Sequence, residues 1–146
     1  MAREHEIYVP PEGPGRLPAL DPAIFGAMGE DGVFRMMEAM YQELGKSSIR
    51  DMFGPDLKAS SQRSAAFYVQ LLGGPPLYNE RYGNPMMRRR HFPFVIDEAA
   101  RKVWLGCFLT TLERADEFGF PAEHLESFRH WLDGFSKWMV NAQSDG

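Results

Sequence analysis

Helical periodicity is the feature that most restricts how this chain can fold. Apolar side chains recur every three or four residues from Val33 to Leu44, which is the spacing of one apolar face on an α-helix. The same spacing returns within residues 64–72, 100–112 and 121–139. No segment of strand length alternates apolar and polar side chains, and there is no internal repeat or low-complexity tract. The sequence therefore predicts an all-α domain.

Residues with special backbone preferences mark the ends of these helices. The second is stopped by Gly-Gly-Pro-Pro at 73–76, where glycine supplies the C-cap and proline prevents continuation. Asp97 can cap the start of the third helix. Pro121 suits the first turn of the fourth, which we therefore expect to open near that residue.

Residues 1–24 form a proline-rich arm. This density of helix breakers excludes a long regular element, so we expect an arm at 1–24 followed by one domain at 25–146. Termini are disordered by default, but an arm can also lie against its domain. The apolar side chains that could anchor it are Ile7, Tyr8, Val9, Leu17 and Leu20.

Composition excludes several classes of protein. The net charge of −4 disfavours a general attraction to nucleic acid. The single cysteine, Cys107, cannot form an internal disulfide, which suits a reducing cytoplasm. No apolar stretch approaches the roughly 20 residues of a membrane helix, and the first residues lack the apolar core of a signal peptide. We therefore expect a cytoplasmic protein with no membrane and no nucleic-acid partner.

One histidine stands in an unusual context. His91 follows three arginines and precedes Phe-Pro-Phe, and Pro93 should end the helical turn that carries it. The arginines could meet carboxylates on a group that docks beside the ring. A histidine held in this way can bind a metal-centred cofactor, although a lone histidine beside apolar residues is more often simply packed or hydrogen-bonded.

The region around His91 also argues against a closed helical bundle. Residues 73–96 form a long break of loop and short helix between the second and third main helices. A closed bundle does not need such a break. A domain that opens a slot between two helix pairs for a flat cofactor does.

Four runs in this region carry a resemblance to a known family. They are Gly-Gly-Pro-Pro-Leu-Tyr at 73–78, Tyr-Gly-Asn-Pro at 82–85, Arg-Arg-Arg-His-Phe-Pro-Phe at 88–94 and Arg-Lys-Val-Trp-Leu-Gly-Cys at 101–107. In this order and spacing they resemble the group II truncated haemoglobins, most strongly over 73–108. The resemblance implies a two-over-two helical sandwich around haem b, with His91 as the proximal iron ligand. The sequence has no Cys-x-x-Cys-His, so the haem is expected to be held non-covalently.

The resemblance also implies a distal pocket for a diatomic ligand. Tyr41 matches the family's ligand-binding tyrosine, and Trp104 matches the tryptophan that reaches over the pocket. Dioxygen on ferrous iron carries partial negative charge, so the tyrosine O–H and the indole N–H would favour it over neutral CO. The other positions implied to face this pocket are Phe53, Ser60, Ser64 and Phe67.

Further positions are implied to touch the haem itself. Arg63 and Arg90 match places where basic side chains meet the haem propionates, and Tyr68 and Phe94 are expected to contact the haem. This chain departs from the family at Ser64, where a larger apolar or amide side chain is more common. It departs again at Asn84, which replaces a common histidine, and in the proline-rich arm.

The expected function is to bind dioxygen and other diatomic ligands (NO, CO) at haem iron. Its work could be oxygen handling or transport, or redox chemistry such as NO dioxygenase or peroxidase-like activity. Redox turnover would need an unidentified reductase, because the chain has no flavin or nicotinamide motif. No histidine lies within about 60–72, so we expect an open or water-occupied sixth site, with a methionine from 36, 37, 40 or 52 left open.

Two other functions stay open at this point. A haem-free helical interaction or sensor module would keep the fold and use its surface. A nucleic-acid contact through the arginines at 88–90 is weakened by the acidic total charge. The oligomeric state is left open.

Overall fold

A computed structural model describes residues 7–11, 13, 17–91 and 94–143. Within these residues the chain is helical and contains no strand, which confirms the all-α prediction. Short 3₁₀ turns (Arg50–Phe53, Ala115–Phe118 and Ala122–His124) connect some of the helices. The α-helices are α1 (Ala23–Gly45), α2 (Leu57–Leu71), α3 (Leu77–Tyr82), α4 (Met87–Arg90), α5 (Glu98–Leu112) and α6 (Leu125–Met139).

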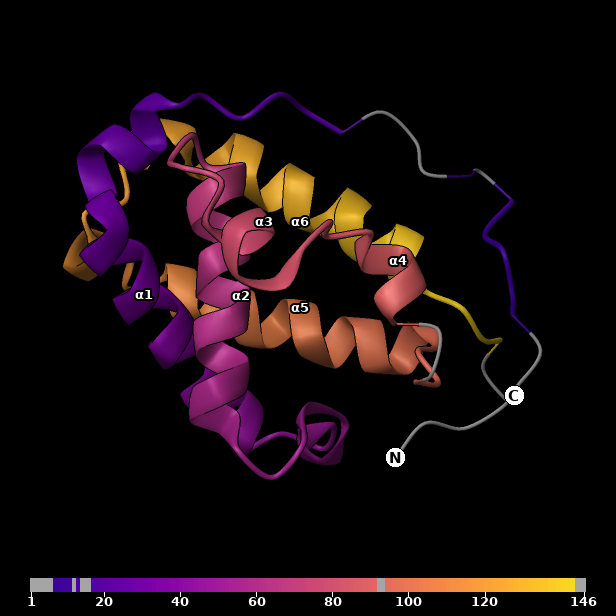
Figure 1. Ribbon diagram of the computed structural model, residues 1–146. Coiled ribbons are helices and arrows are strands. Elements are labelled where there is room, and N and C mark those ends of the chain that lie inside the picture. Colours follow the sequence, from indigo (N-terminus) through magenta and orange to yellow (C-terminus); the bar gives the residue numbers. More distant parts are fainter. Residues whose placement is uncertain (1–6, 12, 14–16, 92–93, 144–146) are drawn as a thin grey trace.

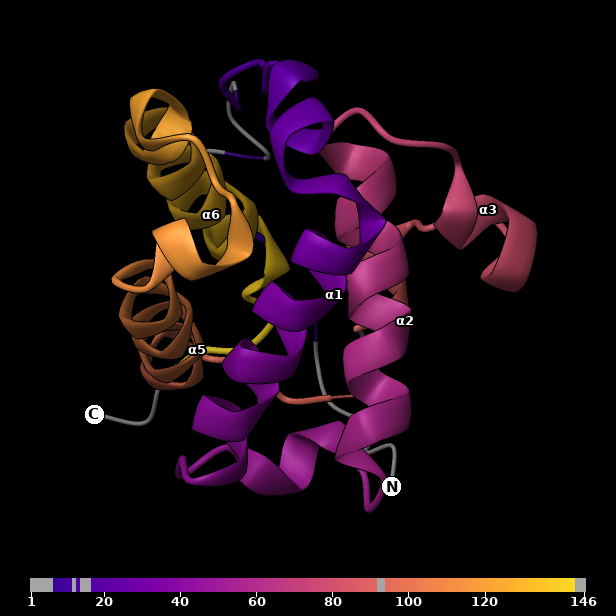
Figure 2. The ribbon, with the colours of Figure 1, turned by 90° about the vertical axis from the view of Figure 1, so that its left-hand side faces the viewer.

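Two crossed helix pairs make the body of the molecule. Helix α1 packs on α2, and α5 packs on α6. Figures 1 and 2 show these pairs as two layers, with the short helices α3 and α4 along one side. This is the two-over-two arrangement that the resemblance implied. No helix in the described part of the chain is long and apolar enough to cross a membrane.

The helix ends follow the local sequence with two differences. The Asp97 carboxylate accepts a hydrogen bond from the Ala100 amide at 2.8 Å, as expected of an N-cap. Pro121, however, precedes the 3₁₀ turn at Ala122–His124, and α6 begins only at Leu125. Helix α1 begins as early as Ala23 and is kinked at Gly29, whose φ of 67° and ψ of 174° are not helical. The predicted effect of Pro93 lies outside the described residues.

The core lies between the two pairs and is rich in methionine and aromatic side chains. Met36 and Met40 of α1 are fully buried, so this face of the helix is core. The Tyr68 ring of α2 packs edge-on against the Phe108 ring of α5, with ring centroids 5.5 Å apart. Gly32 allows a close approach, because a Cβ there would lie 2.5 Å from the Phe118 carbonyl oxygen. These contacts join α2 to α5 and α1 to the 3₁₀ turn at Ala115–Phe118.

The described part of the arm lies against the domain. The Tyr8 amide donates to the Asn141 carbonyl at 2.8 Å, and Leu20 packs against the core. Val9 is 58% exposed, so its side chain contributes little to holding the arm against the domain. Ile24, at the predicted end of the arm, is fully buried at the start of α1. The division at residue 24 stays a prediction, and helical structure begins just before it.

Candidate cofactor site

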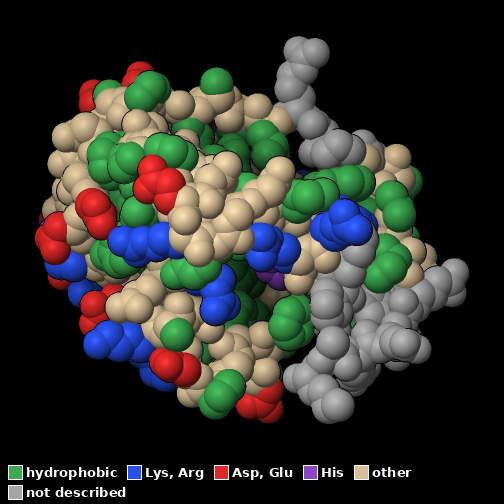
Figure 3. Space-filling view, in the orientation of Figure 1, with side chains coloured by type: hydrophobic (Ala, Val, Ile, Leu, Met, Phe, Trp, Pro, Cys, Tyr) green, Lys and Arg blue, Asp and Glu red, His purple; other side chains and the backbone are tan. Residues whose placement is uncertain are grey.

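A cavity of about 830 Å³ opens between the two helix pairs. Its walls come from α1, α2, α5 and α6, and the segments around α3 and α4 close one side. Figure 3 shows the molecule hollowed on this face, with basic side chains around the opening. The cavity is lined by all of the predicted site residues, namely Tyr41, Phe53, Ser60, Arg63, Ser64, Phe67, Tyr68, Arg90, His91, Phe94 and Trp104.

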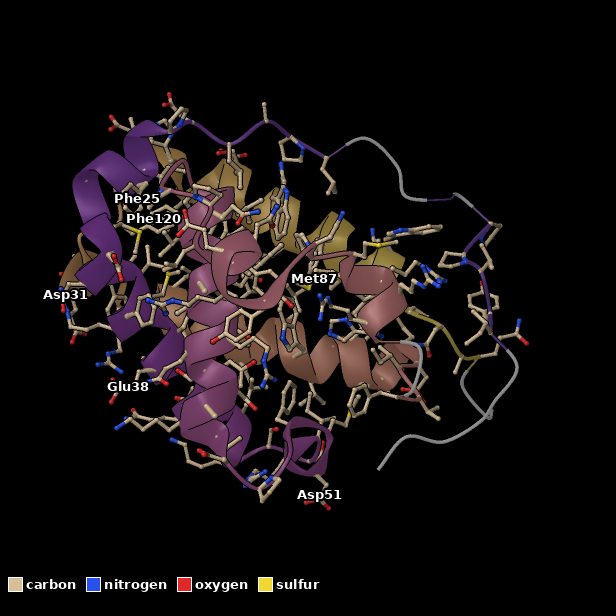
Figure 4. The ribbon with its side chains drawn as sticks, in the orientation of Figure 1. Phe25, Asp31, Glu38, Asp51, Met87 and Phe120 are labelled. Atoms are coloured by element: carbon tan, nitrogen blue, oxygen red, sulfur yellow. The ribbon has the colours of Figure 1, made fainter. Side chains whose placement is uncertain are left out.

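His91 lies on the cavity wall directly after α4. Its Nδ1 lies 2.5 Å from the carbonyl oxygen of Met87, a residue one helical turn earlier that is labelled in Figure 4. A carbonyl can only accept, so Nδ1 carries the proton and the lone pair is on Nε2. Burial lowers the pKa of His91, although the hydrogen bond to Met87 partly opposes this. The imidazole is therefore neutral and oriented, as a metal ligand must be.

His91 is the one histidine among the described residues that line the cavity. The described residues contain no group of three or more histidine, cysteine or acidic side chains that could hold an ion. A metal bound here would therefore have to bring most of its ligands with it. Iron in a flat macrocycle does this, and the cavity has the space and the apolar walls that such a group requires. The residues present thus fit haem.

Helices α1 and α2 bring a polar pair to the cavity. The hydroxyl oxygens of Tyr41 and Ser64 lie 2.6 Å apart, and either can be the donor. Burial raises the pKa of Tyr41, so its hydroxyl stays protonated and able to donate. The Phe53 ring meets Tyr41 edge-on at 5.7 Å and restricts its movement. Trp104 of α5 completes this wall and packs edge-on against Phe108.

Ser60 contributes to this wall in a different way. Its hydroxyl donates to the Phe53 carbonyl at 2.8 Å. The side chain thus ties α2 to the 3₁₀ turn that carries Phe53. Phe67 faces the cavity from α2 and stacks on Phe135 of α6, with ring centroids 6.0 Å apart.

The arginines around His91 differ in what they contact. Arg90 donates to the Asn84 carbonyl at 2.7 Å and lies over the Tyr78 ring at the cavity edge. Arg63 lines the cavity from α2, also beside an aromatic ring. Arg88 instead donates to the Tyr8 and Val140 carbonyls. Arg88 therefore connects the segment before His91 to the arm and to the end of α6.

Several lining residues escaped the sequence analysis. Tyr78, Phe135 and Met139 line the cavity but look like ordinary core residues in the helical pattern. Arg101 also lines it, and its guanidinium donates to Asp133 at 3.2 Å and Ser136 at 3.0 Å, which ties α5 to α6. Met87 could have been predicted, because the carbonyl four residues before a histidine at a helix end lies one turn away and can accept a hydrogen bond from the ring.

Comparisons with known proteins agree with this geometry. A model of the bacterial-like globin family matches residues 23–141. The chain is 32% identical over 120 residues to the group 2 truncated hemoglobin YjbI of Bacillus subtilis, covering 82% of this chain and 89% of that protein.

Solved structures give the same result. The phosphate-bound Hell's gate globin IV superposes with a TM-score of 0.83 at 32% identity, covering 99% of this chain and 88% of that one. The group II truncated hemoglobin from Bacillus anthracis superposes with a TM-score of 0.74 at 30% identity, covering 89% of this chain and 97% of that one.

Proposed function

Since the chain belongs to the bacterial-like globin family, as a group II truncated haemoglobin, we propose that it binds haem b non-covalently and holds dioxygen, NO or CO in the distal pocket. The observation that carries this proposal is the neutral His91 on the wall of the cavity, with its Nδ1–H donated to the Met87 carbonyl. That bond fixes the tautomer and the ring orientation, and it makes Nε2 a more basic iron ligand. When bound, the haem would supply an iron atom that can bind a diatomic molecule.

The distal residues provide hydrogen-bond donors for such a molecule. Tyr41 and Trp104 line the same cavity, and a ligand with partial negative charge attracts both the phenol O–H and the indole N–H. Ser64 decides what Tyr41 can do. If the serine hydroxyl donates to the tyrosine oxygen across their 2.6 Å contact, the tyrosine O–H is released for the ligand. If the tyrosine donates to the serine, its proton is withdrawn from the ligand.

Arg63 and Arg90 are proposed to meet the carboxylates of the haem. Both guanidinium groups belong to the cavity lining. Arg90 is already held by the carbonyls of Tyr82 and Asn84, so its charge is placed before haem binds. A held arginine loses less side-chain entropy on binding than a mobile one. Phe67, Tyr68 and Phe94 are proposed to supply apolar contacts to the ring.

Beyond ligand binding, oxygen handling and NO dioxygenase or peroxidase-like chemistry are proposed roles. Redox turnover would need a partner reductase. We propose that the protein is located in the reducing cytoplasm. The one cysteine, Cys107, is consistent with that location, because a single cysteine cannot form an internal disulfide.

Haem binding has a direct optical test. The purified chain, as isolated or after mixing with haemin, is expected to show a Soret band that shifts when dithionite and then CO are added. Apo-protein titrated with haemin should saturate at one haem per chain. A colourless protein that resists reconstitution would contradict the proposal and leave the haem-free helical module as the alternative.

A second test asks whether the arm is needed for haem binding. Among the described residues, those that line the cavity are Met37 or later in the chain. Deleting residues 1–16 keeps the buried Ile24 and the start of α1, so the truncated protein should still take up one haem. Equal haem stoichiometry in the full and shortened chains, measured by haemin titration, is the expected result. A shortened chain that folds but takes up no haem would make the arm part of the haem-binding domain.

A further inference from the structure

Asn141 joins the two ends of the segment that follows His91. It is fully buried just after α6, and its Nδ2 donates to the His91 carbonyl at 3.1 Å. Its Oδ1 accepts from the Ile96 amide at 3.0 Å, and its own amide donates to the Ile96 carbonyl at 2.9 Å. One side chain therefore holds residues 91 and 96 at a fixed separation.

The arm holds Asn141 from the other side. The Asn141 carbonyl accepts from the Tyr8 amide at 2.8 Å. The Tyr8 carbonyl accepts from Arg88 at 2.9 Å, and the same Arg88 nitrogen donates to Val140 at 3.1 Å. The Arg88 guanidinium also lies 4.4 Å from the centre of the Trp138 ring. Figure 1 shows this end of the arm beside the chain that leaves α6, close to α4.

We propose that Asn141 is a positioning residue for His91 and that the arm, through the Tyr8 amide, holds Asn141 in place. This inference rests on the proposed function, because it concerns the residue assigned as the iron ligand. In this proposal, hydrogen bonds from Tyr8 to Asn141 and from Asn141 to His91 connect the arm to the proposed iron ligand.

The need for such a residue follows from the size of α4. A four-residue helix cannot be stable by itself, so the position of His91 depends on tertiary contacts. The bond from Nδ1 to Met87 lies within the same short segment and orients the ring only relative to it. Asn141 and Arg88 connect that segment to the end of α6. Asparagine suits the position because its amide supplies a donor for His91 and an acceptor for Ile96 at once.

The experiment measures the iron–histidine stretching band of the ferrous proteins by resonance Raman, together with the rate of haem loss to an excess of apomyoglobin. In Asn141→Ala the band should shift or broaden, and haem should be lost about two- to tenfold faster, the effect of one hydrogen bond. Thr111→Val is the matched control, because it removes a buried hydroxyl whose hydrogen bonds, to the Cys107 carbonyl and to the Met40 sulfur, do not involve His91. Its stretching band should match that of the parent.

A second pair of variants isolates the arm. Tyr8→Pro removes the amide that donates to Asn141, while Tyr8→Ala removes the side chain and keeps that amide. The band should shift in Tyr8→Pro, in the same direction as in Asn141→Ala and by less, and stay unchanged in Tyr8→Ala. If Asn141→Ala fails to fold, Asn141→Asp takes its place, because a carboxylate keeps the acceptor for the Ile96 amide and loses the donor to the His91 carbonyl.

The outcomes separate the two proposals. A parent chain that binds haem, with a band that is unmoved in Asn141→Ala or moved equally in Thr111→Val, overturns the positioning role and leaves the proposed function intact. Equal bands in Tyr8→Pro and the parent overturn the part assigned to the arm. A parent chain that binds no haem overturns the proposed function and the positioning role together.

Discussion

Replacing His91 with glycine is expected to weaken haem binding by more than about 100-fold, because loss of an outer-shell partner alone typically costs 10- to 100-fold and this change removes the ligand itself. The space left by the imidazole remains walled by residues of the cavity. Added imidazole should therefore enter, bind the iron and restore much of the bound haem. Haemin titration with and without imidazole measures both effects.

The control for this prediction is the same substitution at His130. That histidine is exposed on α6, and glycine there should cost only about 1 kcal/mol of helix stability. Haem affinity in His130→Gly should equal that of the parent. An unchanged haem content and an unchanged ferrous spectrum in His91→Gly would show that the iron is held by another residue.

The helices were largely predictable from the sequence because they depend on local patterns, whereas the predicted site residues came from the resemblance to a known family. Periodicity and the Asp97 cap predicted the main helices, since an apolar face and a capping carboxylate act within one or two turns. Periodicity does not say what covers that face. Met36, Met37 and Met40 are all buried on one apolar stripe of α1, yet of these three it is Met37 that lines the cavity.

The hydrogen bonds that orient the site were not predictable, because they join residues far apart in the chain. Asn141 contacts the His91 carbonyl across 50 residues, and no local pattern marks an asparagine near the end of a chain as buried. Arg88 could not be distinguished from Arg90 for the same reason. Its partners are carbonyls of the arm and of Val140, which only the folded chain brings together.

The contact between Tyr41 and Ser64 was only partly predictable from the sequence. Both residues were expected at the distal pocket, but their 2.6 Å separation depends on how closely α1 and α2 pack. The short Ser64 side chain places its hydroxyl against the tyrosine oxygen, so α2 influences the hydrogen bonding of Tyr41 through this contact.

The distal residues give the second large expected effect. If Tyr41 and Trp104 each donate to bound dioxygen, each bond to a partly charged acceptor contributes roughly 1 to 3 kcal/mol. Tyr41→Phe and Trp104→Phe should then each speed dioxygen release by about five- to 150-fold. CO release should change less, because CO carries little charge. Stopped-flow displacement of each ligand from the ferrous protein measures these rates, and phenylalanine keeps an aromatic ring against Phe53 or Phe108.

Ser64 determines how the two effects combine. Once Tyr41 is replaced by phenylalanine, the serine hydroxyl loses its 2.6 Å partner and can turn toward the ligand or hold a water there. The double variant should therefore release dioxygen more slowly than the two single effects together predict. Adding Ser64→Ala to the double variant should remove that difference. Release rates within about twofold of the parent in both single variants, well under one hydrogen bond, would make Tyr41 and Trp104 packing residues and place ligand stabilisation elsewhere.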